Sequence, residues 1–206
     1  MRALRLVTAS ANPHKVAEIK AILGGELLLE LLPRPMNIPE VIEDADTLLG
    51  NARLKARAIC AATAMAAVAD DTGLFVDSLL GAPGVHSARY AGPDATDDEN
   101  CTRLLAELKA VGATRSWARR ATFRTVAMVA FPDGSEIWSE GRIEGEIAAT
   151  RQGSGGFGYD PLFVPHDASV RSGRSFAELG VVEKNRISHR ARAFNALAEA
   201  LGQRSE

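Results

Sequence analysis

Two neighbouring carboxylates are the residues most clearly placed to do chemistry. Asp70 and Asp71 end an apolar run that begins at Ala67, and Thr72 follows them. We interpret this run as a buried strand that ends in the two acids. Buried carboxylates are costly unless a partner compensates them, and Mg²⁺ binds carboxylate and phosphate oxygens together. Such a carboxylate can also orient or deprotonate an attacking water. The alternative is an Asp-rich turn.

A second candidate lies near the N-terminus, where a predicted strand over residues 4–10 meets a helix predicted to begin at Asn12-Pro13. The N-terminus of a helix presents free backbone N–H groups and suits an anion. Ser10 and Asn12 add polar side chains, and Lys15 adds a positive charge. The spacing is not that of a Walker A loop. The alternative is an ordinary helix start that Asn12 caps, with Lys15 in solvent.

The segment GSGGFGYDP, residues 153–161, is the most unusual stretch of the chain. Its glycines allow a backbone to approach a ligand closely or to adopt a positive φ. The rings of Phe157 and Tyr159 could stack on a flat base, and Asp160 could accept hydrogen bonds from a base edge. A flexible linker rarely carries two aromatic residues and an acid, so we favour a binding loop over a mobile turn.

Further charged residues could complete such a site. Glu40 and Glu43 belong to an acidic loop and could add a metal ligand, although most of this loop is expected to be solvated. Lys184, His189 and Arg190 lie around the start of the last predicted helix, where positive charge opposes the helix dipole. An anionic group near these residues would explain their position.

The elements that position these residues alternate between strand and helix. Predicted helices cover residues 12–23, 46–65, 99–109 and 188–201, and Gly24-Gly25 is expected to end the first. Predicted strands cover residues 4–10, 67–71, 121–131 and 136–144, with a turn at 132–134 and an ambiguous segment at 26–32. This order indicates a mixed α/β protein.

The composition excludes several classes of protein. The 206 residues are 46% hydrophobic and 24% charged, which is typical of a globular domain and not of a disordered chain. The net charge of −2 disfavours a general nucleic-acid coat protein. We find no secretory signal and no apolar stretch of the roughly 20 residues that a membrane span needs. Cys60 and Cys101 form no metal-binding pair, and we expect ordinary packing in a reducing cytoplasm.

Five stretches of the sequence resemble the inosine triphosphate pyrophosphatase family. They are SANPHKVAEI, NARLKA, VADDTGLFVDSLLGAPGVHSARYAG, GSGGFGYDPLF and EKNRISHRARAF, in the order of the family, and they extend from about Leu4 to Ala198. The resemblance implies an elongated, two-lobed α/β fold with a long central mixed sheet flanked by helices and an active-site cleft between the lobes. It also implies a homodimer. We expect a single domain over residues 1–206, a cytoplasmic location from the cysteine usage, no nucleic-acid partner from the net charge, and no membrane partner from the lack of a long apolar stretch.

The activity that this resemblance implies is hydrolysis of dITP, ITP and XTP to the nucleoside monophosphate and pyrophosphate by Mg²⁺-assisted attack of water. Asp71 would be the catalytic, metal-binding acid, and Asp70 beside it would be a further metal ligand. The implied phosphate ligands are Ser10, Asn12 and Lys15, and Thr72 would touch the substrate. The residues implied to hold the base are Phe157, Gly158, Tyr159 and Asp160. Those implied to contact both base and phosphates are Lys184, His189 and Arg190.

One departure from the family affects the metal site. The family usually has Glu before the Asn of its E-N-A-x-x-K-A helix, and this chain has Gly50 there. We therefore predict that Glu40 or Glu43 supplies the second metal ligand. Two other functions are considered: a nucleotide-binding regulatory module without turnover, and a related pyrophosphatase that acts on other modified nucleotides. Release of pyrophosphate that requires Mg²⁺ would distinguish an enzyme from a module.

Overall fold

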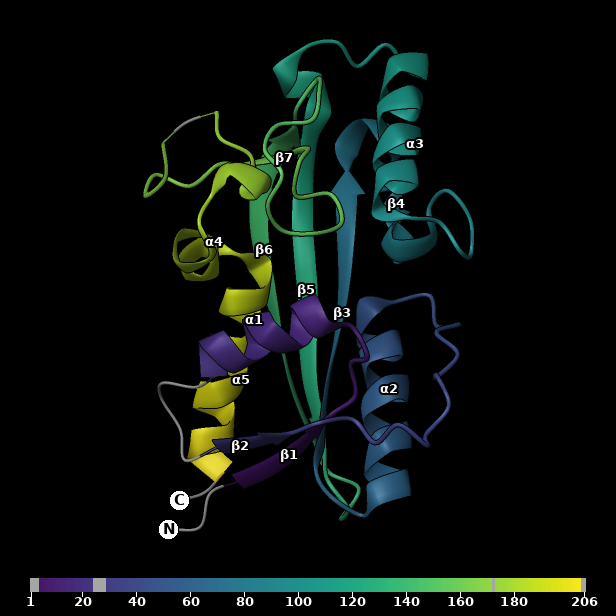
Figure 1. Ribbon diagram of the computed structural model, residues 1–206, viewed down its shortest axis with the longest axis vertical. Helices are drawn as coiled ribbons and strands as arrows, with labels where there is room; N and C mark the ends of the chain where they lie inside the picture. Colours follow the sequence, from purple (N-terminus) through teal and green to yellow (C-terminus); the bar gives the residue numbers. More distant parts are fainter. Residues whose placement is uncertain (1–3, 24–28, 172, 205–206) are drawn as a thin grey trace. The chain divides into compact units, whose positions relative to one another are not determined.

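A computed structural model describes residues 4–23, 29–171 and 173–204 (Figure 1). Its strands are β1 (Leu4–Thr8), β2 (Leu29–Leu32), β3 (Ala67–Val76), β4 (Pro83–Gly84), β5 (Arg120–Ala130), β6 (Glu136–Ile147) and β7 (Phe163–Pro165). Its helices are α1 (Pro13–Leu23), α2 (Leu48–Thr63), α3 (Asp97–Ala110), α4 (Val181–Ile187) and α5 (His189–Arg204). No helix in these ranges is long and apolar enough to span a bilayer.

The strands of the described residues form one mixed sheet, in agreement with the predicted fold class. The order is β2-β1-β3-β5-β6-β7, and β4 pairs with β3 outside this path. Strand β1 is parallel to both β2 and β3, whereas β3–β4 and β6–β7 are antiparallel. The register that matters for the site is Thr8 opposite Val68, because it places the end of β1 two residues from Asp70 on β3.

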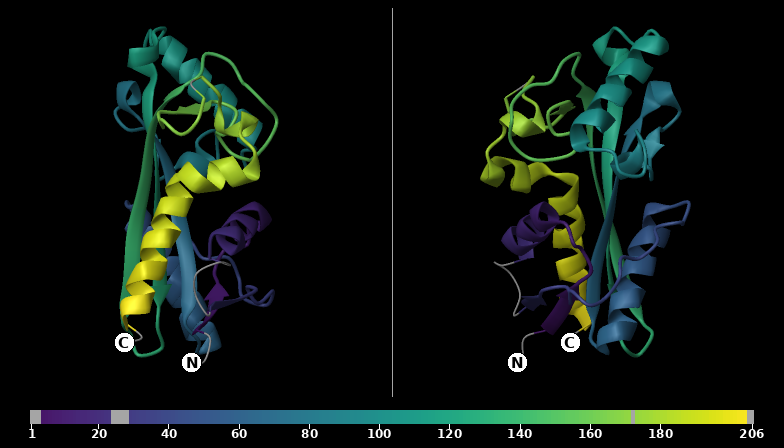
Figure 2. Two further views of the ribbon diagram at one scale, coloured as in Figure 1. Left: turned by 90° about the vertical axis from the view of Figure 1, so that its left-hand side faces the viewer. Right: turned by 45° about the vertical axis from the view of Figure 1, so that its right-hand side comes forward.

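The chain forms two compact units, and each has its own hydrophobic core. Unit 1 comprises residues 1–71, 125–141 and 189–206. In unit 1, α1 packs beside α5, as the views of Figures 1 and 2 agree. Its core includes Leu6, Ile19, Phe194 and Leu197, all at most 1% exposed. The apolar faces of α1 and α5 are therefore buried in this core.

Unit 2 comprises residues 72–124 and 142–188. Three rings, Phe123, Phe163 and Phe176, form the centre of its core, with centroids 4.7 to 6.1 Å apart. Leu104 and Leu108 of α3 are fully buried in the same core. Unit 2 therefore has a close-packed hydrophobic core that supports its loops.

Most predicted elements are present, and their ends follow from local capping. Thr47 caps α2 by accepting a hydrogen bond from Gly50 N–H at 3.0 Å. Helix α3 begins at Asp97, earlier than predicted, because Thr96 and Glu99 form a capping box. The ambiguous segment is a strand from Leu29 to Leu32. Its residues 26–28 and the predicted helix stop at Gly24-Gly25 lie outside the described residues.

The prediction that a strand ends at Asp70-Asp71 was wrong. Strand β3 continues through both acids, Thr72 and Gly73 to Val76, so the carboxylates lie in its middle. The Asp-rich turn is also excluded. The strand continues because lysine and arginine side chains from other elements compensate both acids, as described below. Short helix α4, which directly precedes α5, was not predicted.

Candidate functional site

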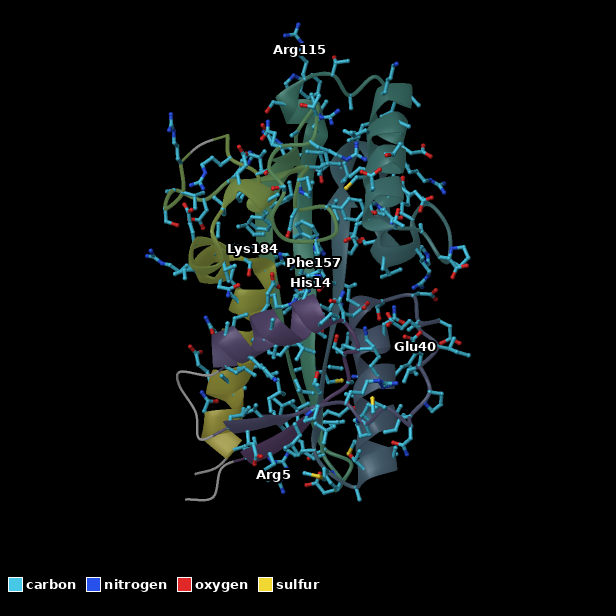
Figure 3. All side chains as sticks on the ribbon, in the orientation of Figure 1. Arg5, His14, Glu40, Arg115, Phe157 and Lys184 are labelled. Atoms are coloured by element: carbon cyan, nitrogen blue, oxygen red, sulfur yellow. The ribbon has the colours of Figure 1, made fainter. Side chains whose placement is uncertain are left out.

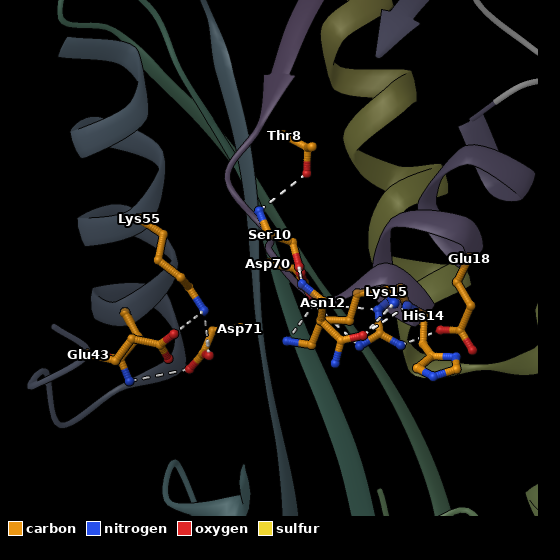
Figure 4. A network of polar contacts seen from close by, with 12 residues as sticks. Thr8, Ser10, Asn12, His14, Lys15, Glu18, Glu43, Lys55, Asp70 and Asp71 are labelled. Carbon is orange, nitrogen blue, oxygen red and sulfur yellow. Dashed lines mark hydrogen bonds and ion pairs between the residues drawn. The ribbon is translucent and has the colours of Figure 1, made fainter. Parts of the chain in front are cut away.

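Asp70 lies at the centre of a buried network of charges in unit 1 (Figure 4). Its side chain is fully buried and lies 3.4 Å from the Lys15 ammonium and 3.3 Å from the Arg190 guanidinium. Arg190 also pairs with Glu18 of α1. The anionic group expected near the basic start of the last helix is therefore formed by Asp70 and Glu18. The alternative in which Lys15 is solvated is excluded.

The start of α1 is capped as the alternative interpretation proposed. Asn12 Oδ1 accepts hydrogen bonds from the N–H groups of His14 at 2.9 Å and Lys15 at 3.3 Å. Ser10 Oγ accepts from Asn12 N–H at 3.2 Å. Ser10 and Asn12 thus order this turn, and they hold the helix so that Lys15 reaches Asp70. A phosphate bound here would compete with these caps for the backbone N–H groups.

Asp71 lies in a second cluster, which was only partly predicted. Lys55 of α2 places its ammonium 2.9 Å from Asp71 and 3.2 Å from Glu43. Asn51, one helical turn before Lys55, donates to Asp71 at 3.4 Å and accepts from Ala45 N–H at 3.0 Å. Helix α2 therefore connects the acidic loop to β3.

The two adjacent carboxylates have opposite electrostatic environments. Burial raises the pKa of Asp70, but the charges of Lys15 and Arg190 outweigh burial and hold this pKa well below its ordinary value. Burial also raises the pKa of Asp71, and here Lys55 and Lys15 do not offset it, so the pKa lies above its ordinary value. Carboxylates with opposite shifts take different roles. Asp70 is a fixed negative charge, whereas Asp71 can accept a proton or a cation.

The residues of unit 1 fit a divalent cation that arrives with a phosphate. Four carboxylates of this unit, Asp70, Asp71, Glu18 and Glu43, form ion pairs with Lys15, Lys55 and Arg190. Carboxylate oxygens are the ligands that a hard divalent cation prefers. Within the described ranges, no three His, Cys, Asp or Glu side chains are arranged to hold a metal. Mg²⁺ commonly needs only one or two carboxylates, because substrate phosphates complete its shell.

Glu40 belongs to a different part of the acidic loop (Figure 3). It is exposed and lines a cavity of about 600 Å³ in unit 1, together with Ser10, Pro13 and Arg34. The guanidinium of Arg34 donates to the carbonyls of Ile38 and Pro39, which directly precede Glu40. The loop is therefore ordered up to Glu40.

Gly50 stands where the local structure leaves no room for a side chain. A Cβ at this position would lie 2.6 Å from Ala45 Cβ and 3.0 Å from Thr47 Oγ1. We expect Gly50→Glu to lower the free energy of unfolding by about 1–3 kcal/mol, because the added atoms displace the cap and the loop. Thermal unfolding measures this, with Ala61→Glu on the exposed face of α2 as the control. Equal melting temperatures for the two variants would contradict this expectation.

In unit 2, Asp160 organises the glycine-rich loop from within. Its Oδ2 accepts a hydrogen bond from Phe157 N–H at 2.9 Å and lies 2.6 Å from the Lys184 ammonium. Asp160 and Lys184 are 3% and 6% exposed. The Lys184 ammonium also lies 5.0 Å from the centre of the Phe157 ring (Figure 3 labels both residues). The loop is thus an ordered structure, and its acid holds Phe157 and Lys184 in place.

Tyr159 has a structural position that differs from the prediction. Its ring is 4% exposed within the core of unit 2, and its hydroxyl donates to the Ser87 carbonyl at 2.8 Å. Burial raises its pKa above the ordinary value. A buried ring cannot stack on a ligand, so the stacking role predicted for Tyr159 was wrong. Phe157, which is half-buried, keeps that predicted role.

Gly156 is required by both its backbone and its surroundings. Its φ is +73°, and a Cβ would lie 1.9 Å from Asp160 Oδ2. We expect Gly156→Ala to break the contacts of Asp160 and to lower the free energy of unfolding by more than about 3 kcal/mol. Gly158→Ala is the control, because φ is +61° there but a Cβ would meet nothing within 4 Å. Left-handed backbone strain alone costs about 1–2 kcal/mol. Equal losses in chemical denaturation would contradict the role of the Asp160 contact.

Three residues with a direct place in these clusters were not predicted from the sequence. Asn51 and Lys55 lie beside the apolar positions of α2, and both are buried. Polar residues four apart next to an apolar stripe are a signal that could have identified them. Glu18 gives no such signal, because its partner Arg190 is distant in the sequence. Thr72 is half-buried on β3, and His189 is buried at the first position of α5.

The fold and site define a class: a mixed α/β protein with a buried carboxylate–cation cluster suited to phosphate and a divalent cation. Residues 6–200 match the Ham1 family, and the chain belongs to this family. It is 45% identical to the dITP/XTP pyrophosphatase of Porphyromonas gingivalis, over 96% of this chain and 97% of that protein. The dITP/XTP pyrophosphatase of Thermus thermophilus is 44% identical, with 97% and 93% covered.

Solved structures agree with these sequence relationships. A HAM1 protein from Coxiella burnetii superposes with a TM-score of 0.86 at 37% identity, with 97% of this chain and 99% of that chain covered. The Ham1 protein of Staphylococcus aureus gives a TM-score of 0.80 at 36% identity, over the same shares of each chain. The resemblance stated from the sequence motifs is thereby confirmed.

Proposed function

We propose that this chain is a nucleoside triphosphate pyrophosphatase that hydrolyses non-standard purine nucleotides, dITP, ITP and XTP, to the monophosphate and pyrophosphate. The observation that carries this proposal is the pair Asp70-Asp71. Asp70 lies 3.4 Å from Lys15 and 3.3 Å from Arg190, whereas Asp71 is oriented by Lys55 at 2.9 Å and Asn51 at 3.4 Å. The names of the relatives supply the substrate class.

The triphosphate is assigned to the start of α1. Lys15 carries the charge that meets it, and burial lowers the pKa of this lysine although Asp70 raises it. A bound phosphate would stabilise the ammonium form and raise that pKa again. Ser10 and Asn12 contribute side chains and the turn that holds Lys15. Thr72, next to Asp71 on β3, is assigned a contact with the same substrate.

Asp71 is assigned the catalytic role. Its carboxylate accepts a hydrogen bond from Lys55 at 2.9 Å, and Asn51 donates to its other oxygen. An orienting partner on each oxygen fixes the direction in which Asp71 can receive a proton from water. Mg²⁺, held by Asp71, would supply charge stabilisation of the phosphates and an acidified water. Asp70 contacts Lys15 and Arg190 and so supports the site as a fixed charge instead of binding the metal directly.

The second carboxylate for Mg²⁺ is Glu43 or Glu40, and the structure gives each a different argument. Glu43 already shares Lys55 with Asp71. Glu40 is exposed beside Ser10, where a cation bound to phosphate could reach it. The two variants Glu43→Gln and Glu40→Gln distinguish these assignments. We propose that loss of the true ligand raises the Mg²⁺ concentration needed for half-maximal activity. An unchanged Mg²⁺ requirement in both variants would overturn both assignments.

The base is assigned to the glycine-rich loop, with the half-buried ring of Phe157 as the stacking surface. The oxygen at position six of hypoxanthine and xanthine accepts hydrogen bonds, whereas adenine has an amino group there. Lys184, His189, Arg190 and backbone N–H groups are the proposed donors. Arg190 already binds Asp70 and Glu18, so its substitution would test the charge network as well as base selection.

Assembly and location are part of the same proposal. We expect a homodimer, which light scattering on the purified protein would measure, and a cytoplasmic location.

The thiols of Cys60 and Cys101 are free and buried, which agrees with the predicted packing role.

The test is pyrophosphate release from ITP, XTP, GTP, ATP and dCTP, each with and without Mg²⁺. We expect rapid release from ITP and XTP only with Mg²⁺, and slow release from ATP. Binding of ITP without release would instead support a regulatory module. Preference for a pyrimidine nucleotide would support a related pyrophosphatase with other substrates.

A further inference from the structure

Two side chains from the first turns of α3 bind the backbone of the glycine-rich loop of unit 2, both at Gly158. Asp97 Oδ2 accepts a hydrogen bond from Gly158 N–H at 2.6 Å. The Cys101 thiol, one turn later, donates to the Gly158 carbonyl at 3.4 Å. Both peptide groups of Gly158 are therefore bound by side chains of a single helix.

These contacts fix the backbone on both sides of Phe157. The peptide before Phe157 is held by Asp160, which accepts its N–H at 2.9 Å. The peptide after Phe157 carries the Gly158 N–H and is held by Asp97. Because a side chain's direction follows from its backbone, the two carboxylates together determine where the Phe157 ring points. Asp160 does so from inside the loop, and Asp97 does so from α3.

The chemistry of the two α3 side chains suits this task. Asp97 is exposed and carries a negative charge, and hydrogen bonds to charged acceptors are the stronger kind. Cys101 is 2% exposed, and burial raises the pKa of its thiol to about 11. The thiol therefore keeps its proton at neutral pH and remains a donor. The N-terminus of helix α3 is itself fixed by the capping box between Thr96 and Glu99.

We propose that Asp97 is a positioning residue that sets the Phe157 ring against the purine base and so contributes to base selection. The inference rests on the proposed function and deepens it, because it identifies a residue outside the loop that determines the shape of the base site. Cys101 supports the same peptide as a weaker, neutral contact.

The expected effect of Asp97→Ala separates positioning from chemistry. The variant should raise KM for ITP about tenfold, which corresponds to the loss of one hydrogen bond to a charged group. Its kcat should change less than about twofold, because Asp71 and its partners lie in another unit of the chain. The preference for ITP over ATP should fall. Asp97→Asn retains an acceptor oxygen and should restore most of the affinity.

The experiment measures kcat and KM for ITP and ATP in wild type, Asp97→Ala, Asp97→Asn and Asp94→Ala. Asp94 is an exposed acid just before α3 and controls for the lost charge. Thermal unfolding of each variant shows that it is folded. A raised KM in Asp97→Ala alone, with rescue by Asn, supports the inference.

Two other results have distinct meanings. If wild type cleaves ITP and Asp97→Ala behaves like Asp94→Ala, the positioning role is overturned and the proposed function stands. If wild type does not cleave ITP, the proposed function fails, and this inference fails with it.

Discussion

Replacing Asp71 with asparagine is expected to reduce pyrophosphate release by a factor of about 10³ or more while the protein remains fully folded. The variant loses the group proposed both to receive a proton from water and to hold the metal, and general base catalysis alone contributes about 10²–10⁴-fold. Asparagine has the same shape, and its oxygen can still accept from Lys55, which lies 2.9 Å from Asp71.

The stability of Asp71→Asn in metal-free buffer should stay close to that of wild type, because Lys55 keeps the carboxylate of Glu43 at 3.2 Å when the charge of Asp71 is lost. The pKa of Asp71 is raised in the folded protein, mainly by burial. A group with a raised pKa destabilises the folded state when it is ionised at neutral pH, and a neutral amide avoids that cost. Chemical denaturation measures the difference. A clear loss of stability would show that the ionised carboxylate is a structural requirement.

Replacing Asp70 with asparagine should instead lower the free energy of unfolding by about 3–5 kcal/mol. Asp70 is fully buried against Lys15 and Arg190, and both are poorly exposed. Without the carboxylate, these cations lose their main compensation inside the protein. Asp71→Asn is the matched control, since it is the same substitution one residue away on the same strand.

The pH dependence follows from the lowered pKa of Asp70. Its stabilisation is fully present above the unfolded value of about 3.9 and is lost as pH falls towards the lower folded value. In metal-free buffer, wild-type stability should therefore decrease below about pH 4 more steeply than that of Asp70→Asn. Identical acid profiles would contradict the role of Asp70 as a fixed charge.

The sequence predicted the local elements well wherever a cap or an apolar stripe defined them. Asn12 caps α1 and Thr47 caps α2, close to the predicted helix starts at residues 12 and 46, and the family resemblance correctly indicated a mixed sheet. These features depend on residues close together in the chain, so a pattern in the sequence is sufficient to identify them.

The errors arise where distant residues decide the local structure. Strand β3 continues through Asp70 and Asp71 because Lys15, Lys55 and Arg190 compensate them, and sequence spacing does not show this. The position of an aromatic ring likewise depends on residues that are distant in the sequence. The ring of Tyr159 is held in the core by the carbonyl of Ser87, which a motif of aromatic residues does not indicate.

The sequence predicted the types of residue in the candidate site better than it predicted the contacts between them. Glu43 was one of two proposed metal ligands, but its connection to Asp71 passes through Lys55, which was not predicted. Asp97 was assigned no role from the sequence, because the predicted helix began only at residue 99. In both cases the function of a residue depends on a contact with a distant segment of the chain.

The central claim is that water, guided by Asp71, cleaves the anhydride bond between the first and second phosphates of a purine triphosphate. Phosphorus NMR of wild type and Asp71→Asn with ITP and Mg²⁺ tests this directly, because it identifies the products. We expect inosine monophosphate and pyrophosphate from wild type and unchanged ITP from the variant. Inosine diphosphate with inorganic phosphate, or equal turnover by both proteins, would contradict the claim.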